Sequence, residues 1–176
     1  MIKLHLIAVF ALATLIVSFS INNIKAQEDS EDYTRVKSKG TISSVNPGTS
    51  GMGSGEYVWI LSGKWKLVAD ETLNNAKFEA EFDMMNYDGT HRHVMKLNDL
   101  QPTSISITNG NVVIEGTIDI LGGHSEDEIN IIPGGDDVNV IILILEDNVI
   151  WIQIDHTHFG GMEHPIYGVV KAIRYA

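Results

Sequence analysis

Six histidines follow the first 26 residues, and their spacing is the strongest chemical signal in the sequence. Two pairs have the pattern His-x-His, namely His91 with His93 and His156 with His158. In a β-strand, residues i and i+2 point to the same face and lie roughly 6.5–7 Å apart, so the two rings of each pair could share one metal ion. His164 follows in the same stretch and could complete such a site.

The residues beside both pairs predict that the histidines face the interior of the protein. The isoleucines of residues 150–154 alternate in step with His156 and His158, and Met95 and Leu97 alternate in step with the earlier pair. Neutral imidazoles bind copper, zinc or nickel, and a thioether adds a soft ligand for copper. Four methionines could supply that ligand: Met84, Met85, Met95 and Met162. The sequence thus predicts a transition-metal site, with copper favoured over zinc, and a hydrogen-bonded polar cluster is the alternative.

Other chemistry has less support. A metalloenzyme needs an open metal position and a proton-transfer partner, and nothing singles out Asp155 or Glu163 for that role. We therefore assign no catalytic residue. The acidic stretches 125–128 and 136–137 lack EF-hand spacing and are interpreted as solvated loops. The chain has no cysteine, which excludes thiolate metal sites and disulfides.

The elements that carry the histidines are predicted to be β-strands. Short β-branched and aromatic stretches recur between turn residues, and no stretch has a helical period. Residues 77–85 alternate between apolar and charged side chains, as a half-buried strand does. Asp88-Gly89 and Asn109-Gly110 are hairpin signals. We interpret residues 90–97 as the strand of the first histidine pair and residues 121–128, with His124, as a loop.

These strands predict a single antiparallel all-β domain, either a β-barrel or a β-sandwich, of about nine or ten short strands. Residues 57–61 and 64–69 flank Ser62-Gly63, which is either a tight turn or a bend in one long strand. Pairing of residues 40–42 with residues 167–169 would close a barrel.

The first 26 residues predict a secretory signal peptide. Lys3 supplies a positive start, and residues 4–19 are almost wholly apolar. Cleavage is expected between Ala26 and Gln27; an uncleaved anchor is the alternative, because the apolar run is near the lower length limit for a bilayer span. Residues 27–39 are interpreted as a flexible acidic lead-in and residues 40–176 as the all-β domain. The protein is therefore predicted to be secreted or displayed at the cell surface.

Composition limits the partners. The chain has 176 residues, of which 44% are hydrophobic, and this suits one domain with a core. The formal net charge is −11, and without Lys3 and Lys25 it would be −13. Such a surface repels nucleic acid and anionic membranes, so we expect neither as a partner apart from the N-terminal segment. A metal ion is the predicted partner.

Four motifs together resemble a known group of proteins. They are Trp59 with Gly63-Lys64-Trp65, Phe78-x-Ala80-x-Phe82, Asp88-Gly89-Thr90-His91-x-His93, and His158-Phe159-Gly160 with Pro165-Ile166-Tyr167-Gly168. The chain is similar in these motifs to a functionally uncharacterised family of short secreted proteins from ammonia-oxidising archaea. The resemblance implies an extracytoplasmic setting in organisms that depend heavily on copper enzymes, and it carries no catalytic assignment.

The function predicted from the sequence is therefore that of an exported binding module whose histidine cluster takes up a transition metal. The candidate ligands are His91, His93, His156, His158 and His164. One alternative is a cell-envelope structural or interaction domain in which the histidines only satisfy hydrogen bonds. Another is a carrier that holds an apolar ligand inside a barrel.

Overall fold

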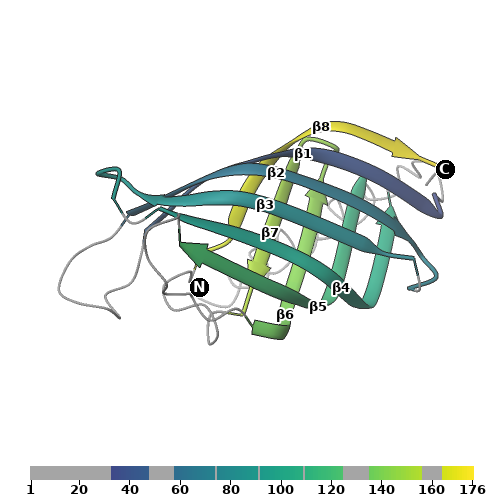
Figure 1. The fold of residues 1–176 in the computed structure, drawn as a ribbon. Coiled ribbons are helices and arrows are strands. Elements are labelled where there is room, and N and C mark those ends of the chain that lie inside the picture. The colour runs from purple at the N-terminus through teal and green to yellow at the C-terminus, as the bar shows by residue number, and fades with distance from the viewer. Residues whose placement is uncertain are drawn as a thin grey trace, which may run out of the picture. The chain divides into compact units, whose positions relative to one another are not determined.

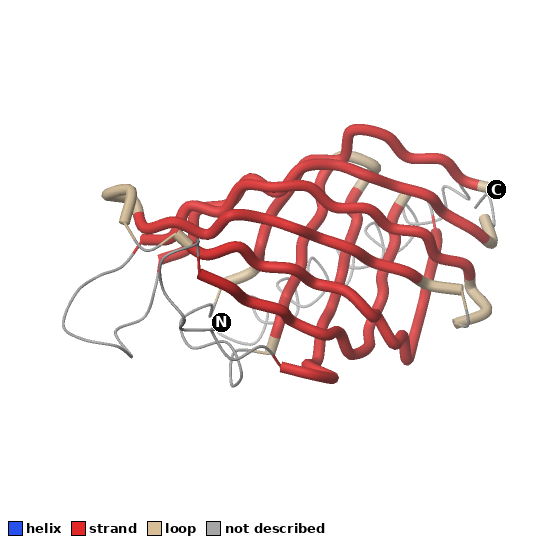
Figure 2. The backbone as a smooth tube through the Cα atoms, viewed as in Figure 1, coloured by secondary structure: helices blue, strands red, loops and turns tan. Residues whose placement is uncertain are grey.

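The computed structural model describes residues 33–47, 58–73, 75–90, 92–108, 110–124, 135–155 and 164–176. Every regular element in these ranges is a β-strand (Figure 2). No helix that could cross a bilayer occurs among the residues described. The strands are β1 (Arg35–Pro47), β2 (Val58–Asp70), β3 (Lys77–Asn86), β4 (His93–Thr108), β5 (Asn111–His124), β6 (Gly135–Leu145), β7 (Val149–Ile154) and β8 (Ile166–Tyr175).

The eight described strands form a closed antiparallel barrel (Figure 1). Each strand pairs with its neighbours in sequence, and β8 returns to pair with β1. The closing ladder joins Thr41 to Val169 and Ile42 to Gly168, so the predicted pairing of these segments is confirmed. The barrel prediction is correct, and the sandwich alternative is wrong for this domain. The ninth or tenth strand of the prediction would include residues 129–132, which lie outside the described residues.

Alternation along the strands separates the barrel interior from its outer surface. On β3, the side chains of Phe78, Phe82 and Met84 are buried, and the charged residues between them face outward, as the sequence predicted. The isoleucines of β7 are buried in the same way. Among the large side chains that are almost completely inaccessible are Trp65, Phe78, Phe82, Leu61, Leu67, Met95, Leu97, Ile107, Ile114, Ile118, Ile120 and Ile142. Side chains therefore fill the interior, and the apolar-carrier alternative gains no support from the described part of the chain.

Two glycines allow neighbouring strands to approach each other closely. A Cβ atom added to Gly40 would lie 1.9 Å from the Val169 carbonyl oxygen and 2.8 Å from two ring carbons of Trp65. A Cβ atom added to Gly63 would lie 2.2 Å from the Glu81 carbonyl oxygen. No real side chain tolerates such distances, so these positions need glycine for close approach rather than for an unusual backbone conformation.

Some strands differ in length from the prediction. Ser62 and Gly63 lie within one continuous strand, β2, and β1 begins at Arg35, five residues before the predicted first strand. β4 starts at His93 and continues to Thr108 through two register shifts. β5 extends to His124, so the prediction of a loop from residue 121 is wrong up to that residue.

Candidate functional site

The described candidate ligands, His93 and His164, lie at one end of the barrel, here called the His93 end. It is the end where β1, β3, β5 and β7 finish and β2, β4, β6 and β8 begin. His93 is the first residue of β4, and His124 is the last residue of β5. His164 lies two residues before β8. The remaining candidate ligands, His91, His156 and His158, lie outside the described residues, but Thr90, Arg92 and Asp155 beside them belong to this end.

His93 is a buried interior residue with only 6% of its surface exposed. It continues the inward row of Met95 and Leu97 on β4, as the alternation predicted. Its ring centre lies 5.6 Å from that of Trp59, with the ring planes tilted by 54°. Trp59 comes from β2, so the imidazole contacts a strand two places away in the barrel. The interior placement of His93 is therefore confirmed.

The residues paired with His93 are themselves able to bind metals. The Cα partner of His93 on β3 is Met84, and its Cα partner on β5 is His124. Met84 is buried to the same degree as His93, with 6% of its surface exposed. Directly paired side chains in an antiparallel ladder have Cβ atoms roughly 4.5–5.5 Å apart, so this end holds an imidazole and a thioether on directly paired, buried positions.

Buried polar side chains also distinguish the His93 end from the apolar middle of the barrel. The Ser44 hydroxyl donates a hydrogen bond of 2.8 Å to the side-chain oxygen of Asn46. The Asn46 amide donates one of 3.2 Å to the His164 carbonyl oxygen. This bond ties β1 to the chain just before β8 and fixes the backbone of His164, whose surface is exposed. Asn86, which is 4% exposed, accepts a hydrogen bond from the Tyr87 backbone amide.

A tight turn and an ion pair fix the approach to His93. The Asp88 carboxylate accepts hydrogen bonds from the backbone amide and the hydroxyl of Thr90, at 2.9 and 2.6 Å. Gly89 has φ +85, a conformation that glycine adopts without strain, so the predicted Asp88-Gly89 turn is confirmed. Arg92 then donates from two of its nitrogens to one oxygen of Asp83, each at 2.8 Å. The outward ion pair holds the start of β4 against β3.

Sequence reasoning missed that His124 lies in a strand. Glycines 122 and 123 precede it and an acidic run follows, so the local signal indicated a loop. Pairing with β4 through Met95–Gly122 and His93–His124 makes this segment a strand instead. No signal in the residues around His124 indicates this pairing.

Within the described ranges, no three His, Asp or Glu side chains converge closely enough to hold a metal ion. The acidic residues Asp136 and Asp137, interpreted above as solvated, are exposed at the start of β6. The described part of the site is thus a buried imidazole, a buried thioether and a polar rim at the His93 end.

Fold and site together define a closed, antiparallel eight-stranded barrel with one polar, histidine-bearing end. Comparison with known proteins gave no match for this chain among family models, curated proteins or solved structures.

Proposed function

We propose that the protein is an exported binding module that takes up a transition metal, copper in preference to zinc, at the His93 end of its barrel. The observation that carries this proposal is the cross-strand pair of His93 and Met84, both buried at that end. An interior imidazole beside an interior thioether is a donor set that suits copper, because thioethers are soft ligands and zinc seldom uses them.

The remaining ligands in this proposal are the histidines predicted from the sequence. His91 is two residues from His93, and His156 and His158 follow the strand that ends at Ile154. His164 has its backbone held by Asn46 at the same end. The motif resemblance to secreted proteins of ammonia-oxidising archaea supports the same function, since such organisms depend heavily on copper enzymes.

Metal titration of the predicted exported form, residues 27–176, tests the proposal. Cu(I), Cu(II) and Zn(II) are titrated at pH 7 into the native protein and into two double variants, His91→Ala/His93→Ala and His156→Ala/His158→Ala. We expect stoichiometric copper binding that both double variants lose. Thermal unfolding with and without copper provides a second readout, because a metal that binds only the native state raises Tm.

A methionine pair provides the matched control for the choice of metal. Met84 is buried inside the barrel, whereas its neighbour Met85 is only half buried. Met84→Leu keeps the volume of the side chain and removes the sulfur, so we expect it to weaken Cu(I) binding by at least ~10-fold, while Met85→Leu leaves it unchanged. Zinc binding should respond to neither change.

One result would favour the structural alternative. If copper binds weakly and neither histidine pair affects it, the acidic surface collects cations without a specific site. The contact of His93 with Trp59 would then be a packing contact, and the protein would be a cell-envelope domain with structural histidines.

A further inference from the structure

The outer surface of β5 to β8 carries a continuous apolar face. In successive ladders, Val113 pairs with Leu143, Leu143 with Trp151, and Trp151 with Tyr167. All of these side chains are outward-facing and at least partly exposed. Together with the neighbouring rows they form what we call the apolar face: Val113, Ile141, Leu143, Leu145, Val149, Trp151, Tyr167 and Val169.

This face is unlike the outer surface around β3. The outward positions of β3 are Lys77, Glu79, Glu81 and Asp83, and Lys64 and Lys96 of the flanking strands lie 3.9 Å from Glu81. On the apolar face, by contrast, Tyr167 and Val169 are 45% and 52% exposed. The exposed area of the whole face is on the order of 500 Å², and patches of this size on a monomer are often functional.

Basic residues lie at one end of the apolar face. Lys37 and Lys39 of β1 and Lys171 and Arg174 of β8 all point outward, and Lys37 is the Cα partner of Arg174. None of the four forms an ion pair with another residue of the described ranges. Like charges directly opposite each other destabilise a sheet, so this group costs stability unless an anionic partner meets it.

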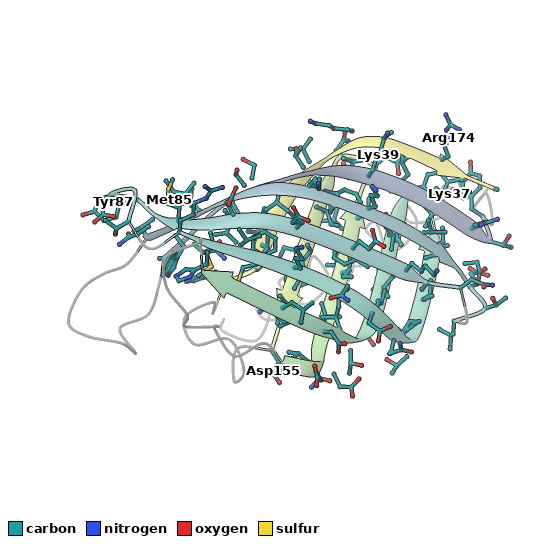
Figure 3. The ribbon with its side chains drawn as sticks, viewed as in Figure 1. Lys37, Lys39, Met85, Tyr87, Asp155 and Arg174 are labelled. Carbon is teal, nitrogen blue, oxygen red and sulfur yellow. The ribbon has the colours of Figure 1, made fainter. Side chains whose placement is uncertain are left out.

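Acidic residues lie at the other end. Glu115 of β5 is the next outward residue after Val113 towards the His93 end, and Asp136 and Asp137 of β6 and Asp155 after β7 lie at that end. In Figure 3, Lys37, Lys39 and Arg174 lie along one edge of the ribbon and Asp155 lies near the opposite edge. The basic end is not wholly free of acidic residues, since the turn from β6 to β7 contains Glu146 and Asp147.

A surface hollow lies where the acidic end meets the apolar face. It has a volume of about 510 Å³, and its lining includes Ile141 of the apolar face, Gln153, and the two acidic residues Glu115 and Asp155. A hollow with an apolar wall and two carboxylates can receive the aliphatic stem and the ammonium group of a lysine. The chain carries such side chains at the opposite end of the same face.

We propose that a second copy of this chain docks on the apolar face and forms a twofold dimer. In a twofold interface the same patch is used by both copies. The twofold axis would lie in the plane of the apolar face, halfway between its basic and acidic ends. It would then bring the basic group of each copy against the acidic group of the other. The apolar face forms the centre and the charged ends form the rim, and together they approach the ~800 Å² per partner of a standard interface.

An anionic membrane surface fits the same face less well. Apolar side chains flanked by lysines do bind such surfaces. Here, however, the carboxylates of Glu115, Asp136 and Asp155 would face the lipid headgroups when the apolar face is inserted, and like charges repel. In a dimer, both the basic end and the acidic end of the face meet the opposite charge, whereas an anionic membrane would meet only the basic end favourably.

The experiment is sedimentation velocity at increasing protein concentration, with a matched pair of variants. Ile141 on the apolar face is 37% exposed, and Ile60 on the outer surface of β2 is 38% exposed. We expect the native protein to dimerise and Ile141→Lys to weaken the dimer by at least ~30-fold. The added ammonium group would occupy the hollow beside Glu115 and Asp155 that the lysine of the second copy would enter, and it would have to lose its water on association. Ile60→Lys should leave the dimer unchanged, and circular dichroism verifies that both variants are folded.

Charge exchange distinguishes self-association from other occupants. Reversal of Lys39 and Lys171 to glutamate should weaken the dimer about 10-fold, and the additional changes Glu115→Lys and Asp136→Lys should restore it. Monomers at all concentrations, equal effects of Ile60→Lys and Ile141→Lys, or binding of the monomer to phosphatidylserine vesicles through Ile141 would each overturn the proposal. None of these outcomes depends on metal binding at the His93 end.

Discussion

Substitution of Gly40 by alanine tests how closely β1 and β8 pack against each other where they close the barrel. The added Cβ atom would lie 1.9 Å from the Val169 carbonyl oxygen, and no atom pair of this kind approaches below 3.0 Å. Movement of the Trp65 ring cannot relieve this contact, because the carbonyl belongs to the backbone of β8. The two strands must therefore separate by roughly 1 Å at this point.

Two costs determine the size of the effect. Overpacking of a close-packed region typically costs about 1–3 kcal/mol. Stretching of a ladder hydrogen bond between the strands removes about 1 kcal/mol more. We therefore expect Gly40→Ala to lower the free energy of unfolding by about 3 kcal/mol, which corresponds to a fall in Tm of about 6–12 °C for a domain of this size.

Urea unfolding followed by far-ultraviolet circular dichroism measures this change, and Gly89 provides the control. An added Cβ atom at Gly89 meets nothing within 4 Å, so Gly89→Ala carries only the strain of φ +85. That strain costs about 1–2 kcal/mol. If Gly40→Ala costs no more than Gly89→Ala, then β1 and β8 are not packed as the closed barrel requires, and the reasoning is refuted.

Three further predictions concern the core and two titrating groups. Phe82→Ala, at a side chain 1% exposed, should lower the free energy of unfolding by about 3–5 kcal/mol in urea, and a loss below ~1 kcal/mol would contradict its interior packing. Burial, with a hydrogen bond to Asp147, raises the pKa of Tyr175 above its usual 10.0. The folded state therefore holds the proton of the Tyr175 hydroxyl more tightly than the unfolded state does. The stability that this group contributes is complete below pH ~10 and is lost as the pH rises further. Tyr175→Phe should remove this alkaline dependence of the free energy of unfolding, as measured in unfolding titrations. The Thr72 hydroxyl lowers the pKa of Asp70, so stability from this group persists above pH ~4 and is lost as the pH falls through the lowered pKa. In an NMR titration, Thr72→Val should raise the Asp70 pKa, and an unchanged value would refute the assignment.

Alternation was sufficient to predict which side chains enter the barrel. A period of two residues predicts the inward rows of β3 and β7 and the inward position of His93, because one face of each strand must be buried away from water. The pairing of residues 40–42 with residues 167–169 was also predictable, since β-strands at the two ends of an up-and-down sheet are the only ones left to pair.

Strand ends and irregularities were harder to predict, because they depend on long-range pairing. Asn98, Asp99 and Pro102 indicate a loop locally, yet β4 passes through them with two register shifts and a left-handed residue, Asp99 with φ 55. Contacts with β5 outweigh the local preference. His124 was missed for the same reason, and its pairing with His93 could not be read from the residues around it.

The barrel closure described above also orders the events of folding. Seven of the eight described ladders join strands that are consecutive in sequence, whereas the β1–β8 ladder joins residues from the two ends of the domain, such as Val36 and Tyr175. The entropy of closing a loop grows with its length, so this ladder is expected to form after the hairpins. A destabilising change in the β1–β8 ladder, such as Gly40→Ala, should then accelerate unfolding and leave the refolding rate nearly unchanged in stopped-flow measurements. The lifetime of the native state, rather than the speed of its formation, is therefore set where the two ends of the domain meet.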